Sequence, residues 1–182
     1  ESGIGIGYTG MRIRGIDPTR INVTINGIPY NDSESQGVYW VNLPDITSSV
    51  QDIQIQRGVG SSTNGAGAFG ASVNLRTKSV HTDPYAEING AYGSFNTFKT
   101  NIQVGSGLLN DHFSFDARLS KLQTDGYIDH SSSNHESFFV SGTYYTEKTL
   151  IKANVFRGKE RTGISWWGVP DYMLDDNRTY NP

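Results

Sequence analysis

The sequence predicts an α+β unit of short strands and turns, followed by an antiparallel sheet of long strands with two distinct faces. The first observation is a change of pattern near residue 80, which predicts two domains, residues 1–79 and 80–182. Before it, short alternating segments are separated by glycine-rich turns; after it, the alternating segments are longer. The second is composition: the 182 residues include 21 Gly, and only 18% are charged, whereas about 25% is usual in soluble domains.

One hairpin is predicted near the start of the first domain. Residues 11–14 and 21–25 alternate in polarity, as strands with one buried face do. Asn26-Gly27 is a favoured two-residue turn, after which residues 28–30 resume the extended pattern.

The remainder of the first domain is predicted, in order, as an exposed loop, a short helix and two strands: residues 31–37, 45–50, 52–56 and 72–76. The helix follows Pro44, because proline is favoured in the first helical turn. Residues 61–70 are almost all small, which predicts close packing or a sharp bend.

Five strands are predicted in the second domain: residues 84–93, 97–106, 113–122, 138–146 and 149–157. Each has an apolar face opposite a polar one; Phe113 and Phe115, for example, alternate with Ser114 and Asp116. A two-residue period in successive strands predicts an antiparallel meander.

The second domain has two further features of a transmembrane β-barrel. Aromatic residues gather near the strand ends, and short turns alternate with longer connections at residues 124–137 and after Gly158. These patterns also fit a soluble β-sandwich with one solvated face, because a two-residue period alone does not show whether the apolar face contacts lipid or a protein core.

Composition excludes several classes of function. A net charge of −3 gives no basic footprint for nucleic acid. The absence of Cys excludes disulfides and thiolate metal sites. No apolar run approaches the roughly 20 residues of a membrane helix.

Three stretches of the first domain resemble the plug domain of TonB-dependent outer-membrane receptors. Residues 22–29 (NVTINGIP) are similar to the family's xVxIDGVP hairpin, with Asn26 in place of Asp. Residues 53–58 (IQIQRG) resemble the strand IExIEVxRGP, with Val59 where Pro is common. Residues 65–77 (GAGAFGASVNLRT) are similar to YGSGAxGGVINIxT.

This resemblance implies an α+β plug domain followed by the antiparallel strands of a truncated 22-stranded transmembrane β-barrel. It implies active transport without enzymatic chemistry or a cofactor, in the outer membrane of a Gram-negative bacterium. The partners implied are TonB, through an upstream segment absent here, the outer-membrane lipid and a small-molecule ligand, with no nucleic acid.

The cargo that the resemblance implies is a ferric siderophore or another iron complex. A glycan is disfavoured, because SusC-type plugs have a Lys-Asp-Ala-Ser-type stretch where residues 57–61 are Arg-Gly-Val-Gly-Ser. The alternative function is a soluble or cell-surface β-rich binding module for carbohydrate or protein.

The candidate ligand contacts lie at the plug apex and in the last loop: Tyr30, Asn31, Asp32, Glu34, Gln36, Tyr39, Trp40, Trp166 and Trp167. The alternative role of Tyr39 and Trp40 is to pack the plug against the barrel wall. The alternative role of Trp166 and Trp167 is to anchor the last loop at the membrane interface. The resemblance implies that Arg14 and Arg57 pair with barrel carboxylates; the alternative is ordinary surface charge.

Two further patterns carry no site. The four His residues fall in predicted loops and turns without ligand spacing, so no metal site is expected. Residues 65–70 match G-x-G-x-x-G, but no crossover helix follows, so we expect close packing and no dinucleotide site.

Overall fold

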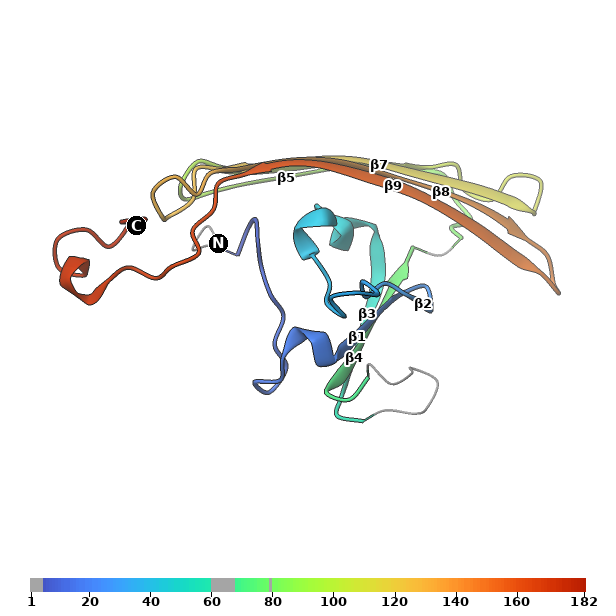
Figure 1. Ribbon diagram of the computed structural model, residues 1–182. Helices are drawn as coiled ribbons and strands as arrows, with labels where there is room; N and C mark the ends of the chain where they lie inside the picture. The colour runs from blue at the N-terminus through green and yellow to red at the C-terminus, as the bar shows by residue number, and fades with distance from the viewer. Residues whose placement is uncertain (1–4, 60–67, 79) are drawn as a thin grey trace. The chain divides into compact units, whose positions relative to one another are not determined.

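The computed structural model describes residues 5–59, 68–78 and 80–182, which divide into two compact units (Figure 1). One unit comprises Gly10–Trp40 and Ile46–Ser79; the other comprises Glu1–Thr9, Val41–Asp45 and Val80–Pro182. Over the described ranges, no helix is long and apolar enough to span a membrane.

The first unit is a four-stranded mixed sheet in the order β2-β1-β4-β3. Its strands are β1 (Ile21–Ile25), β2 (Ile28–Pro29), β3 (Val50–Arg57) and β4 (Ala71–Thr77). Strands β1 and β4 are parallel, and the other pairs are antiparallel. The core is a cluster on the two central strands: Ile21, Val23, Ala71, Val73 and Leu75.

The predicted hairpin is confirmed, and its turn is tied to the far end of β4. Asn26 and Gly27 both have positive φ, +53° and +82°, as a two-residue turn of this type needs. The Asn26 side chain donates to Thr77 Oγ1 and accepts from the Thr77 amide, both at 2.9 Å. An Asn serves here because it both donates and accepts.

Short 3-10 helices connect the strands: η1 (Pro18–Arg20), η2 (Trp40–Asn42) and η3 (Ile46–Ser49), with η5 (Asp171–Met173) near the C-terminus. The helix expected after Pro44 is therefore present as 3-10. The Asp17 carboxylate caps η1 by accepting from the Thr19 amide and hydroxyl, and these hydrogen bonds lower the pKa of Asp17.

The strand predicted at residues 11–14 is wrong. Arg14 and Gly15 both have positive φ, so the chain reverses there and leaves a single bridge between Ile13 and Ile16. Most of the small-residue stretch 61–70 lies outside the described residues. At its end, a Cβ on Gly70 would lie 2.5 Å from Ile16 Cγ2, so this glycine does pack closely.

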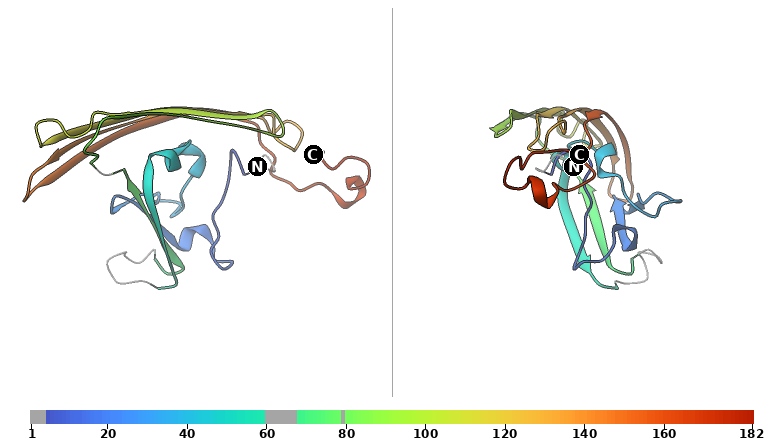
Figure 2. Two further views of the ribbon diagram at one scale, coloured as in Figure 1. Left: turned by 180° about the vertical axis from the view of Figure 1, so that it is seen from behind. Right: turned by 60° about the vertical axis from the view of Figure 1, so that its left-hand side comes forward.

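The five strands predicted in the second domain are all present. They are β5 (Tyr85–Gly93), β6 (Thr97–Gly105), β7 (Phe113–Thr124), β8 (Ser133–Tyr145) and β9 (Leu150–Thr162). They form an antiparallel meander in chain order, a single curved layer in Figure 1 and in both views of Figure 2.

Strands β8 and β9 are longer than predicted, and the connection before β8 is correspondingly shorter. Residues 133–137 and 158–162 pair in full register although their side chains are mostly polar on both faces. The period-2 signal therefore disappears there, because it needs apolar side chains on one face.

In this sheet the apolar face is exposed and the polar face is buried, which is the opposite of a water-soluble β-sandwich. On the apolar face, Phe115, Leu119 and Val155 are 53%, 64% and 61% exposed. On the polar face, Ser114 and Arg118 are 1% and 3% exposed. An exposed apolar band beside a covered polar face is the arrangement of a transmembrane barrel wall.

Candidate functional site

The most concentrated charge on the polar face surrounds Asp45. Its Oδ2 accepts a hydrogen bond from Arg118 Nη1 at 2.9 Å and another from the Ser120 hydroxyl at 2.5 Å. Its Oδ1 lies 2.5 Å from Lys99 Nζ. Lys99 is on β6 and the other two residues are on β7, so two neighbouring strands hold one carboxylate.

Because this cluster is buried, its stability depends on the presence of each charged side chain. The side chains of Asp45 and Arg118 are 4% and 3% exposed, whereas Lys99 is 33% exposed. A buried charge without its partner is costly, so removal of the carboxylate leaves Arg118 in an unfavourable state. Asp45 has a φ of +54°, a left-handed conformation that Asp adopts more readily than most residues.

Two more segments of the same unit lie directly against the polar face. A Cβ on Gly158 would lie 2.4 Å from Pro44 Cγ. Strand β9 can therefore approach Pro44 only because Gly158 has no side chain. Gly7, with a φ of +91°, lies close to the hydroxyls of Ser133 and Thr162. Residues 7 and 44–45 thus cover polar side chains of the sheet.

In the other unit, the loop at residues 31–37 is organised by two of its own predicted ligand residues. Asn31 Oδ1 accepts from the Val23 amide at 2.7 Å, and its Nδ2 donates to the carbonyls of Ile21 and Gln36, each at 2.8 Å. All three bonds fix the loop to β1 and to itself. The Asn31 amide is therefore engaged within the protein.

Asp32 is the second organiser of this loop. Its Oδ1 accepts from the Ser35 amide at 2.7 Å, the Ser35 hydroxyl at 2.9 Å and the Glu34 amide at 3.1 Å. These hydrogen bonds, led by that of the Ser35 amide, lower the pKa of Asp32. Hydrogen bonds from the loop thus favour the ionised form of Asp32, and no cation among the residues that the structure describes forms an ion pair with it.

The other candidate residues of this loop differ in exposure. Glu34 and Gln36 are exposed, and Tyr39 is 53% exposed. Trp40 packs against the core cluster of the first unit, which gives its ring a structural role. Tyr30 is half-buried, and burial raises the pKa of its hydroxyl.

Trp166 and Trp167 are among the most exposed aromatic side chains of the described residues, at 68% and 76%. Trp166 contacts Tyr8 of the same unit, with ring centroids 5.5 Å apart. These two tryptophans belong to a different unit from Tyr39.

Arg14 and Arg57 are exposed, and neither forms an ion pair with a carboxylate among the residues that the structure describes. The expected pairing with barrel carboxylates stays a prediction. Sequence reasoning missed Asp45 because the resemblance implied positive charge on the plug and negative charge on the wall. The available signal was the pair of cations, Lys99 and Arg118, on predicted polar faces.

The prediction that all four histidines lie in loops and turns is wrong for His135, which is in β8 and 5% exposed. Across the described ranges, no three His, Asp or Glu side chains are placed to hold a metal ion.

The compact mixed-sheet unit has the fold of a plug domain, and the meander with its exposed apolar face has the fold of an outer-membrane barrel wall. The family described as TonB-dependent Receptor Plug Domain matches residues 1–72. Residues 1–72 are therefore similar to the plug domain of TonB-dependent receptors, and this match together with the fold indicates the outer membrane of a Gram-negative bacterium.

Solved structures share this fold. The ferric citrate transporter FecA, in its unliganded form, covers 99% of this chain at 19% identity and a TM-score of 0.74. The pyoverdine receptor FpvA from Pseudomonas aeruginosa PAO1 covers 88% at 16% identity and a TM-score of 0.67. The ferric yersiniabactin uptake receptor FyuA from Yersinia pestis covers 78% at 14% identity and a TM-score of 0.60. This chain spans 29%, 25% and 22% of those proteins, respectively.

Proposed function

We propose that the protein containing this chain is an energy-coupled outer-membrane receptor that takes up a scarce ligand, a ferric siderophore or another iron complex. Residues 1–79 are the C-terminal part of its plug, and residues 80–182 are the first strands and loops of its barrel. TonB, acting through an upstream segment, supplies the force that opens the path.

The observation that supports this most is the way in which Asp45 is held on the polar face. Arg118, Lys99 and Ser120 bind it through hydrogen bonds and charge. Contacts of this kind separate without exposing apolar surface, because water replaces each partner. They suit a closure that must hold at rest and be released by force.

Similar structures support the cargo class. They include FpvA bound to pyoverdine, the ferric citrate transporter FecA and the ferric yersiniabactin uptake receptor FyuA. In this chain we propose that Tyr39, Glu34 and Gln36 of the plug, with Trp166 and Trp167, contact the ligand. Tyr30, Asn31, Asp32 and Trp40 shape the surface that these residues present, and Arg14 and Arg57 pair with later barrel strands.

Uptake by cells that produce the full-length receptor tests the proposal. Radiolabelled ferric citrate, ferric hydroxamate and ferric catecholate complexes are compared with a copper complex and an oligosaccharide. We expect binding of one iron complex with or without TonB, and uptake only with TonB. Uptake without TonB, or selective uptake of copper or the oligosaccharide, contradicts the proposal.

A further inference from the structure

Three neighbouring polar atoms on the polar face of the β5–β9 sheet are buried without a hydrogen-bond partner among the residues that the structure describes: His135 Nε2, Ser137 Oγ and Glu160 Oε2. His135 and Ser137 are two residues apart on β8, so their side chains leave the same face of the sheet. Glu160 of β9 lies directly opposite His135. The three atoms therefore belong to one small area of this face, and buried polar atoms of this kind call for a partner.

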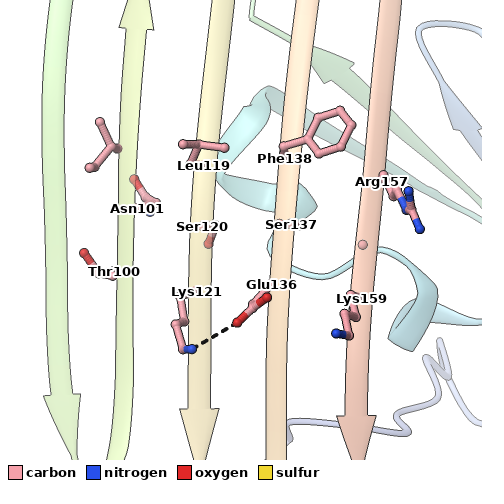
Figure 3. Close-up of a pocket in the computed structure, with 12 residues that line it drawn as sticks. Thr100, Asn101, Leu119, Ser120, Lys121, Glu136, Ser137, Phe138, Arg157 and Lys159 are labelled. Carbon is pink, nitrogen blue, oxygen red and sulfur yellow. Dashed lines mark hydrogen bonds and ion pairs between the residues drawn. The ribbon is translucent and has the colours of Figure 1, made fainter.

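The cations that are close to Glu160 in the sequence lie on the other face of the sheet. Figure 3 shows Lys159 beside Glu136 and Lys121, on the exposed face where Lys121 pairs with Glu136. Because successive side chains of a strand alternate, Glu160 points to the opposite face from Lys159. Within the described ranges, no cation forms an ion pair with Glu160. Its buried carboxylate oxygen thus has no counter-charge from this part of the protein.

The charge of Glu160 decides which kind of partner fits. Ser141 and Asn154 form a second opposite pair with unpartnered buried atoms, but that pair is neutral, so a water molecule satisfies it. A buried carboxylate needs a positive charge as well as hydrogen bonds. Lys99 and Arg118, on the same face, are bound to Asp45. An imidazole nitrogen beside a carboxylate oxygen is a ligand set for Zn²⁺ and Cu²⁺.

The positions of the two strands allow one ion to contact both side chains. Residues directly opposite each other in an antiparallel sheet have Cβ atoms about 5 Å apart. Bonds of about 2.0–2.2 Å hold two donor atoms about 3–4 Å apart, which rotation of the His135 and Glu160 side chains achieves. Two protein ligands leave positions for water, in keeping with the lack of three-residue metal clusters across the described ranges. Ser137 Oγ is placed to hydrogen-bond to such a water ligand.

Two segments of the same unit border this area of the sheet. Gly7 lies close to the hydroxyl of Thr162, two residues from Glu160 on β9. Pro44 lies against Gly158, two residues from Glu160 in the other direction. The pair therefore lies between two segments that cover the polar face, which explains its burial.

We propose that His135 and Glu160 bind a divalent transition-metal ion of the Zn²⁺ or Cu²⁺ class, with Ser137 hydrogen-bonded to a water ligand of the ion. The ion supplies the positive charge that Glu160 lacks and joins β8 to β9. This site is independent of the transported ligand and goes beyond the proposed uptake function. The sequence predicted no metal site because it placed His135 in a loop instead of opposite a carboxylate in a sheet.

Equilibrium dialysis of the full-length receptor in detergent against Zn²⁺, with the bound metal measured by mass spectrometry, tests the proposal. His135→Gln and Glu160→Gln should each bind one Zn²⁺ fewer per receptor than the wild type. Ser137→Ala should keep the ion with about 10-fold lower affinity, as is usual when a hydrogen bond to the ligand shell is lost. The matched control is His130→Gln, which removes an exposed histidine from the connection before β8 and should leave the Zn²⁺ content unchanged.

The wild-type receptor gives a second readout with Cu²⁺ as the probe. Its electron paramagnetic resonance should show a copper ion coupled to imidazole nitrogen, and this component should be lost in His135→Gln. An excess of Mg²⁺ should not displace Zn²⁺, because Mg²⁺ prefers oxygen ligands only.

Equal Zn²⁺ content in the wild type and both ligand variants, an equal loss in His130→Gln, or displacement by Mg²⁺ overturns the proposal. Resistance of the barrel to SDS at room temperature verifies that each variant is folded. If a ligand variant does not fold, a wild-type copper spectrum without imidazole coupling overturns the proposal by itself. The metal content is measured without TonB and without a transported ligand, so failure of the uptake proposal leaves this result unaffected.

Discussion

Asp45 accepts a hydrogen bond from Arg118 at 2.9 Å, and both side chains are almost completely buried on the polar face of the second sheet. A residue from the segment before η3 is thus held by charge on β7, 73 positions further along the chain. Lys121, the residue directly after Ser120 on the same strand, forms its ion pair with Glu136 on the exposed face. One strand therefore carries a buried and an exposed pair whose contributions can be compared.

We expect Asp45→Ala to lower the free energy of unfolding of the full-length receptor by about 3–5 kcal/mol, because the buried Arg118 loses its ion pair with the Asp45 carboxylate. Glu136→Gln, which breaks the exposed pair with Lys121, should cost much less, because solvent screens this pair. Urea unfolding in detergent, followed by tryptophan fluorescence, measures both. Equal costs for the two variants would show that Asp45 is not held as described.

Asn31→Ala should loosen the loop at residues 31–37, because the Asn31 side chain makes three hydrogen bonds to main-chain groups. Loss of these bonds should cost about 1–3 kcal/mol locally and increase amide exchange of the Gln36 region. Ser33→Ala is the control, since the Ser33 side chain is exposed in the same loop. Hydrogen exchange with mass spectrometry compares them, and similar exchange in both variants would be inconsistent with this role.

The same loop should loosen in acid. The folded-state pKa of Asp32 is lowered below its usual value of 3.8, so ionised Asp32 stabilises the loop. This contribution is fully present above about pH 4 and is lost as the pH falls through the folded-state pKa. Amide exchange of residues 32–37, corrected for intrinsic rates, should rise below pH 4. Asp32→Asn should remove this acid step; a step of the same size in that variant excludes Asp32 as its origin.

Substitutions of Tyr39 and Trp40 should affect ligand binding and protein stability differently. Tyr39 is 53% exposed, so Tyr39→Ala should change stability by less than about 1 kcal/mol, while it weakens ligand binding if Tyr39 contacts the iron complex. Trp40 packs on the plug core, so Trp40→Ala should cost about 3 kcal/mol. Calorimetry and equilibrium binding to the same purified receptor give both values. Unchanged binding in Tyr39→Ala removes this residue from the proposed ligand surface.

The elements that the sequence predicted well are those whose signal is local. The turn at Asn26-Gly27 follows from two residues that favour positive φ, and strands β5–β7 follow from alternation over their own length. Residues 11–14 also alternate, yet the tight reversal at Arg14 and Gly15 prevents a strand there. The alternation of polar and apolar residues does not indicate such a reversal, and Arg is not a residue that usually marks a turn.

The long-range relationships were not predictable in the same way. The parallel pairing of β1 with β4 joins residues 50 positions apart, and the Asp45 cluster joins residues more than 70 apart. No pattern within either segment specifies its partner. The early start of β8 was missed because Ser133, His135 and Ser137 alternate with other polar residues, so its two faces do not differ.

The central claim is that the apolar face of β5–β9 contacts lipid while the polar face borders an aqueous interior. Nitroxide labels on single cysteines at Phe115 and Asp116, neighbours on opposite faces of β7, test it most directly in the full-length receptor in lipid bilayers. The account predicts that the label at 115 is relaxed mainly by oxygen, which concentrates in the bilayer, and the label at 116 mainly by a water-soluble nickel chelate. The reverse preference, or the same preference at both positions, would contradict it.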